Sequence, residues 1–345
     1  MRIDTAERPF IIAWELTQAC DLSCDHCRAD AKPERHPNEL TTDEAKTLLD
    51  RLAAFGEKQL VVFTGGDVLK RPDLFELIEY GTDAGLTITL TPSATDAITR
   101  ETVQRFKQLG VRRIALSMDG PDSETHDAFR GEEGSFDSIV RTATWAKEVG
   151  LPLQINTTVC RSTADFIPEI AHRVEGLEAV MWALFFLVPV GRGIDLEGLT
   201  PTEAERLLTW VAETAASAPF GVKTTEAPMY RRIVEQHEMT PRQGLGGDLG
   251  ILAGDGFMFV SHTGEVTPSG FLPYSVGNVR EADPVTLYRE SELFQGLRDR
   301  SSLGGKCGDC EFNELCGGSR SRAFATTGDP FAQDPLCPYV PSSSV

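Results

Sequence analysis

The first residues that could do chemistry lie in CDLSCDHC, residues 20 to 27, which brings Cys20, Cys24 and Cys27 within eight positions. Three thiolates in one short loop can bind three irons of a four-iron cubane cluster, and the fourth iron then stays open to another molecule. A structural zinc site is the alternative, but zinc prefers four ligands arranged as Cys-x-x-Cys pairs, and His26 is poorly placed as the fourth. The spacing therefore favours an iron–sulfur cluster with one open iron.

A second group of cysteines lies in the tail, where Cys307, Cys310, Cys316 and Cys337 form a set of four. Four thiolates complete the ligation of a cluster, so this site is expected to be closed. Spacing alone does not decide between zinc and iron–sulfur here. The eighth cysteine, Cys160, has no partner at ligand spacing. It is expected to be buried as a small apolar residue, with a catalytic thiol as the alternative.

The Cys-x-x-x-Cys-x-x-Cys spacing, directly after a predicted first strand, resembles the signature of the radical S-adenosylmethionine (radical SAM) enzymes. The resemblance implies that the amino and carboxylate groups of SAM chelate the open iron. It also implies that electron transfer cleaves SAM to methionine and a 5′-deoxyadenosyl radical, so that a donor such as ferredoxin or flavodoxin is needed. The alternative from another class is a non-catalytic iron–sulfur electron carrier. Such a protein would be expected to have lost the first three cysteines or the glycine pair described next, and both are present.

Three further stretches resemble the SAM contacts of that family. Gly65, Gly66 and Asp67 stand in place of a Gly-Gly-Glu motif, where backbone groups and a carboxylate hold the SAM ammonium, although Asp is one methylene shorter than Glu. Ser117 matches a position that contacts the SAM ribose or carboxylate, and His26 resembles the residue that packs on the adenine. On spacing alone these residues would be a strand-to-helix turn, an ordinary strand end and a loop histidine.

Asp119-Gly120 and HDAFRG (126 to 131) are typical of one subgroup of the family, and the tail resembles the SPASM auxiliary-cluster domain. Ser269 and Arg320 stand where that domain would have further cysteines, which leaves one auxiliary four-iron cluster. Nearly the whole chain, including HTGEVTPSGFLP (262 to 273) and the segment 316 to 337, resembles the branch that modifies tetrapyrroles in alternative heme and heme d1 synthesis.

That branch implies removal of acetate groups or oxidative decarboxylation of propionate groups on an iron tetrapyrrole. Relatives with the same architecture modify ribosomally made peptides, so a peptide substrate is the alternative. His262, Tyr274 and Arg320 are the candidates for cavity-lining residues in the second half of the chain.

The elements that must position these residues follow a repeated strand and helix pattern up to about residue 190. Thr41 and Thr200 each begin a helix with capping-box spacing, and another helix is expected from Ser135 to Val149. Six such units predict an α/β fold, a partial (βα)6 TIM-like barrel with its site at the carboxyl ends of the strands. The six apolar runs that predict the strands are 10 to 16, 59 to 64, 86 to 91, 112 to 118, 151 to 159 and 180 to 188.

Beyond the barrel, glycine increases from 244 to 256, and FMFVSHTGEVTPSG (257 to 270) predicts a hairpin that turns at residues 262 to 264. We therefore expect a radical SAM core over 1–195, a helical connection over 196–245, and a small cysteine-rich iron–sulfur module over 246–345. Cysteines clustered at close spacing indicate metal ligands of a reducing compartment rather than disulfides.

The composition sets limits on partners. The formal net charge of −19 and the absence of a basic patch argue against nucleic acid, because a phosphate backbone would be repelled. No run of eighteen apolar residues and no secretory signal occur, which predicts a cytoplasmic protein without a membrane partner. The excess of acidic residues and of Arg over Lys also fits a halophilic source.

Overall fold

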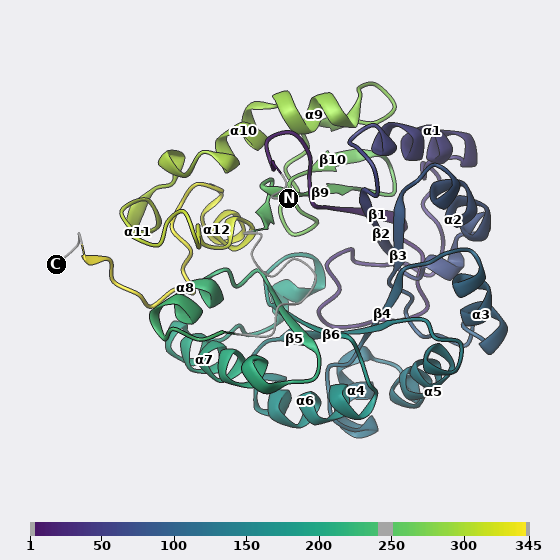
Figure 1. Cartoon of the computed structure of the whole chain (residues 1–345), viewed down its shortest axis with the longest axis horizontal. Coiled ribbons are helices and arrows are strands. Elements are labelled where there is room, and N and C mark those ends of the chain that lie inside the picture. The colour runs from purple at the N-terminus through teal and green to yellow at the C-terminus, as the bar shows by residue number, and fades with distance from the viewer. Residues whose placement is uncertain (1–3, 241–250, 343–345) are drawn as a thin grey trace.

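The described strands of this computed structural model, which covers residues 4–240 and 251–342, form a single curved sheet. Their order is β11-β10-β9-β1-β2-β3-β4-β5-β6-β7, with β8 paired to β9. Neighbours from β1 to β7 are parallel. In Figure 1 the helices α1 to α7 wrap around the outside of this sheet, which is the arrangement of a TIM-like barrel. The ends β11 and β7 do not pair within the described residues, so the barrel is open, as expected.

All six strands predicted from the apolar runs are present, from β1 to β6. The bounds of the strands are β1 Ile11–Thr17, β2 Leu60–Gly65, β3 Thr87–Leu90, β4 Arg113–Ser117, β5 Leu153–Val159, β6 Met181–Phe186, β7 Gly221–Thr225, β8 Leu252–Ala253, β9 Gly256–Val260, β10 Glu265–Thr267 and β11 Gly277–Asn278.

The helices expected from capping signals are confirmed. Thr41 and Thr200 each accept a backbone N–H of the third helical residue, and Glu44 and Glu203 close both capping boxes. The α-helices are α1 Thr42–Ala53, α2 Leu74–Asp83, α3 Arg100–Gln108, α4 Ser123–Arg130, α5 Ser135–Glu148, α6 Ile167–Gly176, α7 Pro201–Ser217, α8 Met229–Gln236, α9 Pro284–Glu290, α10 Glu292–Arg298, α11 Gly305–Gly308 and α12 Arg320–Thr327. The 3-10 turns are η1 Val68–Lys70, η2 Ala164–Phe166, η3 Gly191–Asp195 and η4 Arg300–Ser302.

Two strands extend the wall beyond the six expected. β7 pairs with β6 inside the segment that we expected to be a helical connection, and its sequence GVKTT carries too few apolar residues to be noticed. β9 and β10 form the predicted antiparallel hairpin, but β9 also pairs in parallel with β1, through Ile11 with Phe257 and Ala13 with Phe259. The second half of the chain thus contributes to the barrel wall.

The two faces of the sheet differ in polarity. Ile12, Trp14 and Leu16 of β1 are fully buried in the large core between the sheet and the helices. Because side chains alternate along a strand, Ala13 and Glu15 face the barrel interior. A carboxylate on a strand buried on both faces indicates a functional interior. Among the described residues, no helix is both long and apolar enough to span a membrane.

Candidate functional site

The loop after β1 carries the first three cysteines, and all three are free thiols. Cys20 and Cys24 are buried, and Cys27 is partly buried. The Leu22 N–H lies 3.4 Å from the Cys20 sulfur, and the Ala31 N–H lies 3.4 Å from the Cys27 sulfur. Backbone donors aimed at sulfur stabilise thiolate ligands, so this loop fits an iron–sulfur cluster held by three cysteines.

Arg130, at the end of α4, places a buried positive charge beside this loop. Burial disfavours the charged guanidinium, but the neighbouring thiols, Cys24 foremost, and Asp119 raise the pKa of Arg130 above its usual value. Burial also disfavours the charged form of Cys24, so it raises the pKa of that thiol, and the positive charge of Arg130 partly opposes the rise. Arg130 pairs with Asp119 at 3.3 Å. A fixed cation therefore lies where an anionic cluster would be bound.

Asp119 is itself held in place after β4. Its Oδ1 accepts a hydrogen bond from the Thr158 N–H at 2.7 Å, and its own N–H donates to His126 Nδ1 at 3.1 Å. The residues that were singled out only as typical of a subgroup, Asp119 and the segment 126–131, thus orient Arg130. The sequence analysis did not assign a role to Arg130. The presence of an arginine within the segment 126–131 was the feature that could have pointed to it.

His26 lies against Phe129, with ring centroids 4.8 Å apart and planes within 7° of parallel. Its Nε2 is 3.2 Å from the Arg130 guanidinium, while Nδ1 has no partner among the described residues. Burial lowers the pKa of His26 to about 4, so the ring is neutral near pH 7. One ring face is already covered by Phe129. The contact of His26 with the adenine of SAM stays a prediction.

Gly65 and Gly66 let the cysteine loop approach the end of β2. Gly65 has φ +145°, and a Cβ added there would lie 2.4 Å from the carbonyl oxygen of Thr17. A Cβ on Gly66 would lie 2.2 Å from the carbonyl oxygen of Ala19, directly before Cys20. Only glycine permits this approach, so the pair positions the cysteine loop as well as offering backbone groups.

Asp67 is fully buried, and its carboxylate is engaged by the protein. It accepts hydrogen bonds from the Leu69 N–H at 3.1 Å and from the Thr95 hydroxyl at 2.7 Å. Ser93 links the same loop to the cysteines, since its hydroxyl donates to the Gly66 carbonyl at 3.0 Å and lies 3.7 Å from the Cys20 sulfur. A direct contact of Asp67 with the SAM ammonium stays a prediction, and the role seen here is to fix these loops.

Ser117 is the last residue of β4, and its side chain faces the barrel interior because Ile114 and Leu116 face the helices. It pairs in register with Asn156 of β5. The carboxyl ends of β1, β2 and β4 therefore bring Ser117, the glycine pair and the cysteine loop to one edge of the sheet, which is where the site was expected.

The four tail cysteines lie near two helices: Cys307 belongs to α11, and Cys316 and Cys337 act electrostatically on Arg232 of α8. Burial raises the pKa of Cys316 to about 12 and also raises that of Cys337, and their charges act on each other. Cys307 accepts the Asp334 N–H at 3.3 Å, and it interacts electrostatically with Cys310. Among the described residues, no three His, Cys, Asp or Glu side chains converge closely enough to hold a single metal ion.

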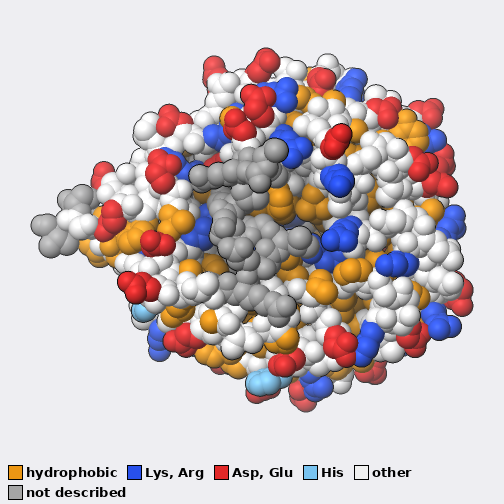
Figure 2. Space-filling model, viewed as in Figure 1, with side chains coloured by type: hydrophobic (Ala, Val, Ile, Leu, Met, Phe, Trp, Pro, Cys, Tyr) orange, Lys and Arg blue, Asp and Glu red, His pale blue; other side chains and the backbone are white. Residues whose placement is uncertain are grey.

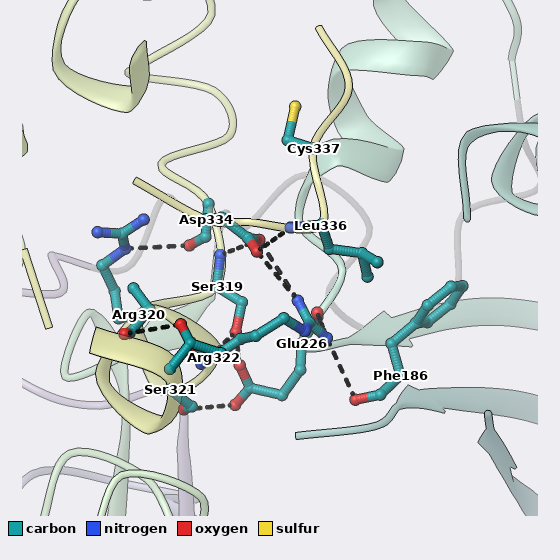
Figure 3. A network of polar contacts seen from close by, with 12 residues as sticks. Phe186, Glu226, Ser319, Arg320, Ser321, Arg322, Asp334, Leu336 and Cys337 are labelled. Atoms are coloured by element: carbon teal, nitrogen blue, oxygen red, sulfur yellow. Dashed lines mark hydrogen bonds and ion pairs between the residues drawn. The ribbon is translucent and has the colours of Figure 1, made fainter. Parts of the chain in front are cut away.

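The positions where further cluster ligands would stand hold a polar network instead (Figure 3). Ser269 donates to Glu226 at 3.4 Å, and Ser321 donates to the same carboxylate at 2.8 Å, joined by Ser319. Arg320 is buried and donates to the carbonyl oxygen of Ala332 at 2.7 Å. These residues bond to one another and to the backbone, so they stabilise the tail.

The three residues that the sequence suggested as cavity-lining lie in different surroundings. His262 lies in the barrel, where its Nδ1 is 2.5 Å from Glu15. Tyr274 is half exposed and touches Phe324, and Arg320 is enclosed in the tail rather than lining a cavity. Cys160 is fully buried after β5 beside Ser162 and Thr163, which agrees with a packing role. Glu15 was missed, although a glutamate within the apolar run FIIAWEL was a usable signal.

Comparison with known proteins places this geometry in a family. Residues 14–172 match the model of the Radical SAM superfamily. The chain is 42% identical to an AdoMet-dependent heme synthase of Nitratidesulfovibrio vulgaris, over 96% of this chain and 92% of that protein. The chain belongs to the radical SAM superfamily. It is therefore an iron–sulfur enzyme that uses a four-iron cluster and SAM.

Two further relatives bear on this radical SAM enzyme. A Methanosarcina barkeri Fe-coproporphyrin III synthase is 31% identical, over 95% of this chain and 87% of that protein. The crystal structure of Streptococcus suis SuiB bound to its precursor peptide SuiA superposes with a TM-score of 0.75 at 18% identity, covering 96% of this chain and 76% of that one. The second likeness confirms the fold alone.

Proposed function

We propose that this radical SAM enzyme modifies the carboxylate-bearing side chains of an iron tetrapyrrole on a route to heme. The observation that carries the proposal is the 42% identity to a heme synthase along 96% of the chain. The open barrel with polar groups on its inner face suits a substrate that is flat, apolar in its ring and charged at its rim. Oxidative decarboxylation of propionate to vinyl is the form of the reaction that we favour.

When bound, the cluster and SAM supply a carbon radical that abstracts hydrogen. Removal of one hydrogen atom from the carbon of a propionate next to the ring, followed by loss of carbon dioxide and one electron, leaves a vinyl group. An electron donor such as ferredoxin or flavodoxin and an electron acceptor are both needed. We assign Cys20, Cys24 and Cys27 to the SAM-binding cluster, and Cys307, Cys310, Cys316 and Cys337 to one auxiliary cluster.

In this proposal the residues of the chain position the reactants. Arg130 balances the negative charge of the cluster, and the Gly65-Gly66 pair sets the distance between the cysteine loop and β2. His26 and Ser117 contact SAM, and Asp67 holds the loop that carries Ser93. The barrel wall from β1 to β7 excludes water from the radical.

The test is anaerobic incubation of the reconstituted enzyme with SAM, a reductant and iron coproporphyrin III, with didecarboxysiroheme as the second substrate. Mass spectrometry should detect 5′-deoxyadenosine together with a tetrapyrrole that has lost carboxylate carbon. A triple variant with Ala at positions 20, 24 and 27 should give neither product. Deoxyadenosine from the triple variant would contradict the assignment of the SAM site.

The rival is a peptide substrate, as in SuiB, whose likeness to this chain rests on the fold. A parallel incubation with a peptide library separates the two. Modification of peptide without any change in either tetrapyrrole would replace the proposed substrate, while SAM cleavage without any substrate reaction in either case would leave the class of enzyme unchanged.

A further inference from the structure

Two basic side chains of separate strands face the interior of the barrel. Arg113 is the first residue of β4, and its neighbour Ile114 belongs to the core under the helices, so Arg113 points inward. Lys223 is the central residue of β7, and its neighbour Val222 packs against the same core. Lys223 therefore also projects into the barrel. Both side chains are only partly exposed.

Neither side chain forms a hydrogen bond or ion pair within residues 4–240 and 251–342. Three other cations are engaged by the protein: Arg28 and His262 pair with Glu15, and Arg231 donates to the Ile251 carbonyl at 3.0 Å. The chain has 52 acidic against 33 basic residues, so an unpaired inward cation is unexpected on composition.

The electrostatics of Lys223 show that this arrangement is costly. Burial, together with the charges of Arg113 and Arg231, lowers the pKa of Lys223 to about 8. Burial also lowers the pKa of Arg113, and Arg112 adds to that effect. Among residues 4–240 and 251–342, no acidic group acts on either residue. Like charges held together without a counter-ion destabilise the protein, and an anionic ligand would relieve this repulsion.

A third donor lies on the same strand. Thr225 follows Lys223 by two residues, so the two side chains lie on one face of β7. The Thr225 hydroxyl is buried and has no hydrogen-bond partner among the described residues. On the face drawn in Figure 2, several Lys and Arg side chains lie close to the middle, and others lie at the edge among Asp and Glu side chains.

We propose that Lys223, Arg113 and Thr225 bind a carboxylate of the substrate that does not react. The inference rests on the proposed tetrapyrrole substrate and names the part of the barrel that holds it. Arg113 begins β4 and Ser117 ends it at the cysteine edge, which separates the two by about 13 Å at 3.3 Å per residue. A carboxylate bound at Arg113 is therefore remote from SAM. It orients the ring so that a different side chain reaches the radical.

The test measures binding of iron coproporphyrin III to the reconstituted enzyme through its visible absorption band. Lys223→Met should weaken binding about tenfold or more, the range for a hydrogen bond to a charged group. Lys223→Arg keeps the charge and should restore most of the affinity. Thr225→Val should give a smaller loss. The matched control is Lys147→Met, because Lys147 is exposed on α5 and pairs only with the exposed Glu178.

Two further readouts separate ligand binding from a structural role. Without substrate, Lys223→Met should raise the thermal unfolding midpoint, because it removes a partly buried cation that has no ion-pair partner among the described residues. A lower midpoint with unchanged affinity would overturn the proposal. The tetramethyl ester of iron coproporphyrin III lacks carboxylates, so the parent and Lys223→Met should bind it equally.

The outcomes also distinguish this inference from the proposed function. If the parent converts iron coproporphyrin III and Lys223→Met binds it as tightly as the parent, the carboxylate site is wrong and the function stands. If the parent neither binds nor converts any tetrapyrrole, the proposed function is wrong, and so is the tetrapyrrole carboxylate as the ligand of this site. Binding of acidic peptides that depends on Lys223 would overturn the tetrapyrrole assignment.

Discussion

At the scale of single residues, Gly66 is the position where the smallest change should have the largest effect. A methyl group there would meet the carbonyl oxygen of Ala19 at 2.2 Å, so the segment before Cys20 would have to shift. We expect Gly66→Ala to lower the iron content of the reconstituted enzyme and its SAM cleavage at least severalfold. The control is Gly176→Ala at the end of α6, where an added Cβ meets nothing within 4 Å. Full iron content in Gly66→Ala would show that the loop adapts.

Glu15 should make stability depend on pH. Burial alone would raise its pKa, but Arg28 and His262 outweigh burial and hold the pKa of Glu15 at about 2, against an ordinary 4.5. A lowered carboxyl pKa adds stability that is fully present above about pH 4.5 and is lost as the pH falls toward 2. The difference corresponds to about 3 kcal/mol.

Urea unfolding of the apoprotein between pH 7 and pH 3 measures this effect. Glu15→Gln should be less stable than the parent at pH 7, and the two curves should converge at low pH. Glu175→Gln, at an exposed position in α6, should follow the parent throughout. A constant gap between Glu15→Gln and the parent at every pH would mean that packing, rather than charge, explains the loss.

The sequence predicted the residues whose role depends on neighbours along the chain. The cysteine loop, the glycine pair and Ser117 lie at one sheet edge because strand order and spacing place them there. Arg130 and Lys223 could not be singled out from the sequence, because the groups that surround their side chains meet only in the folded barrel. Asp67 shows the limit of a motif, since its carboxylate is occupied by Leu69 and Thr95.

At the scale of elements, Arg322 of α12 fastens the tail to the barrel. Its guanidinium donates to the Glu226 carbonyl at 2.8 Å and to the Leu187 carbonyl, just after β6, at 3.2 Å. It also pairs with Asp334, which is fully buried, at 3.4 Å. Figure 3 shows Arg322 between Asp334 and Phe186 of β6. One side chain thus joins α12, β6 and the segment before Cys337.

Arg322→Met should lower the free energy of unfolding by about 3–5 kcal/mol, because it leaves the buried carboxylate of Asp334 without its partner. Arg100→Met provides the matched control, since Arg100 pairs with Glu148 on the surface and such pairs contribute about 1 kcal/mol or less. Urea denaturation of both apoproteins gives the comparison. Equal losses in the two variants would rule out Arg322 as the main fastening.

The elements that escaped prediction are the ones whose partners are distant in sequence. Each of the six predicted strands has an apolar run, because β1 to β6 are covered by helices on one face and line the barrel on the other. β7 lacks such a run, since Val222 is the one large apolar side chain in its sequence GVKTT. The pairing of β9 with β1 joins residues about 246 positions apart, from Ile11 to Phe257, and no local pattern encodes that.

At the scale of the whole molecule, the tail and the barrel form one continuous structure. β9 continues the sheet beyond β1, and the network of Glu226, Ser319 and Arg322 joins α12 to the turn after β7. The tail therefore has fastenings made of protein, in addition to any metal. This arrangement makes it feasible to remove the auxiliary cluster without unfolding the chain.

Cys316→Ala tests what the auxiliary cluster does. Cys316 is buried and its thiol pKa is about 12, so the apoprotein carries it as a neutral side chain that alanine can replace with little cost in charge. Because Arg322 and Glu226 still hold the tail, we expect the variant to fold, to lose about four irons per chain and to keep cleaving SAM. The tetrapyrrole should stay unmodified, so deoxyadenosine would form without product.

Metal analysis, circular dichroism and product detection on one preparation decide between the roles. Cys160→Ala is the control, since Cys160 is buried and belongs to neither cysteine group. This variant should keep the iron content and the activity of the parent. A loss of one zinc instead of iron in Cys316→Ala would identify the tail as a zinc site. Conversion of substrate at the parent rate by a folded Cys316→Ala would exclude a catalytic role for the auxiliary cluster, because the barrel and its SAM-binding cluster would then suffice for the whole reaction.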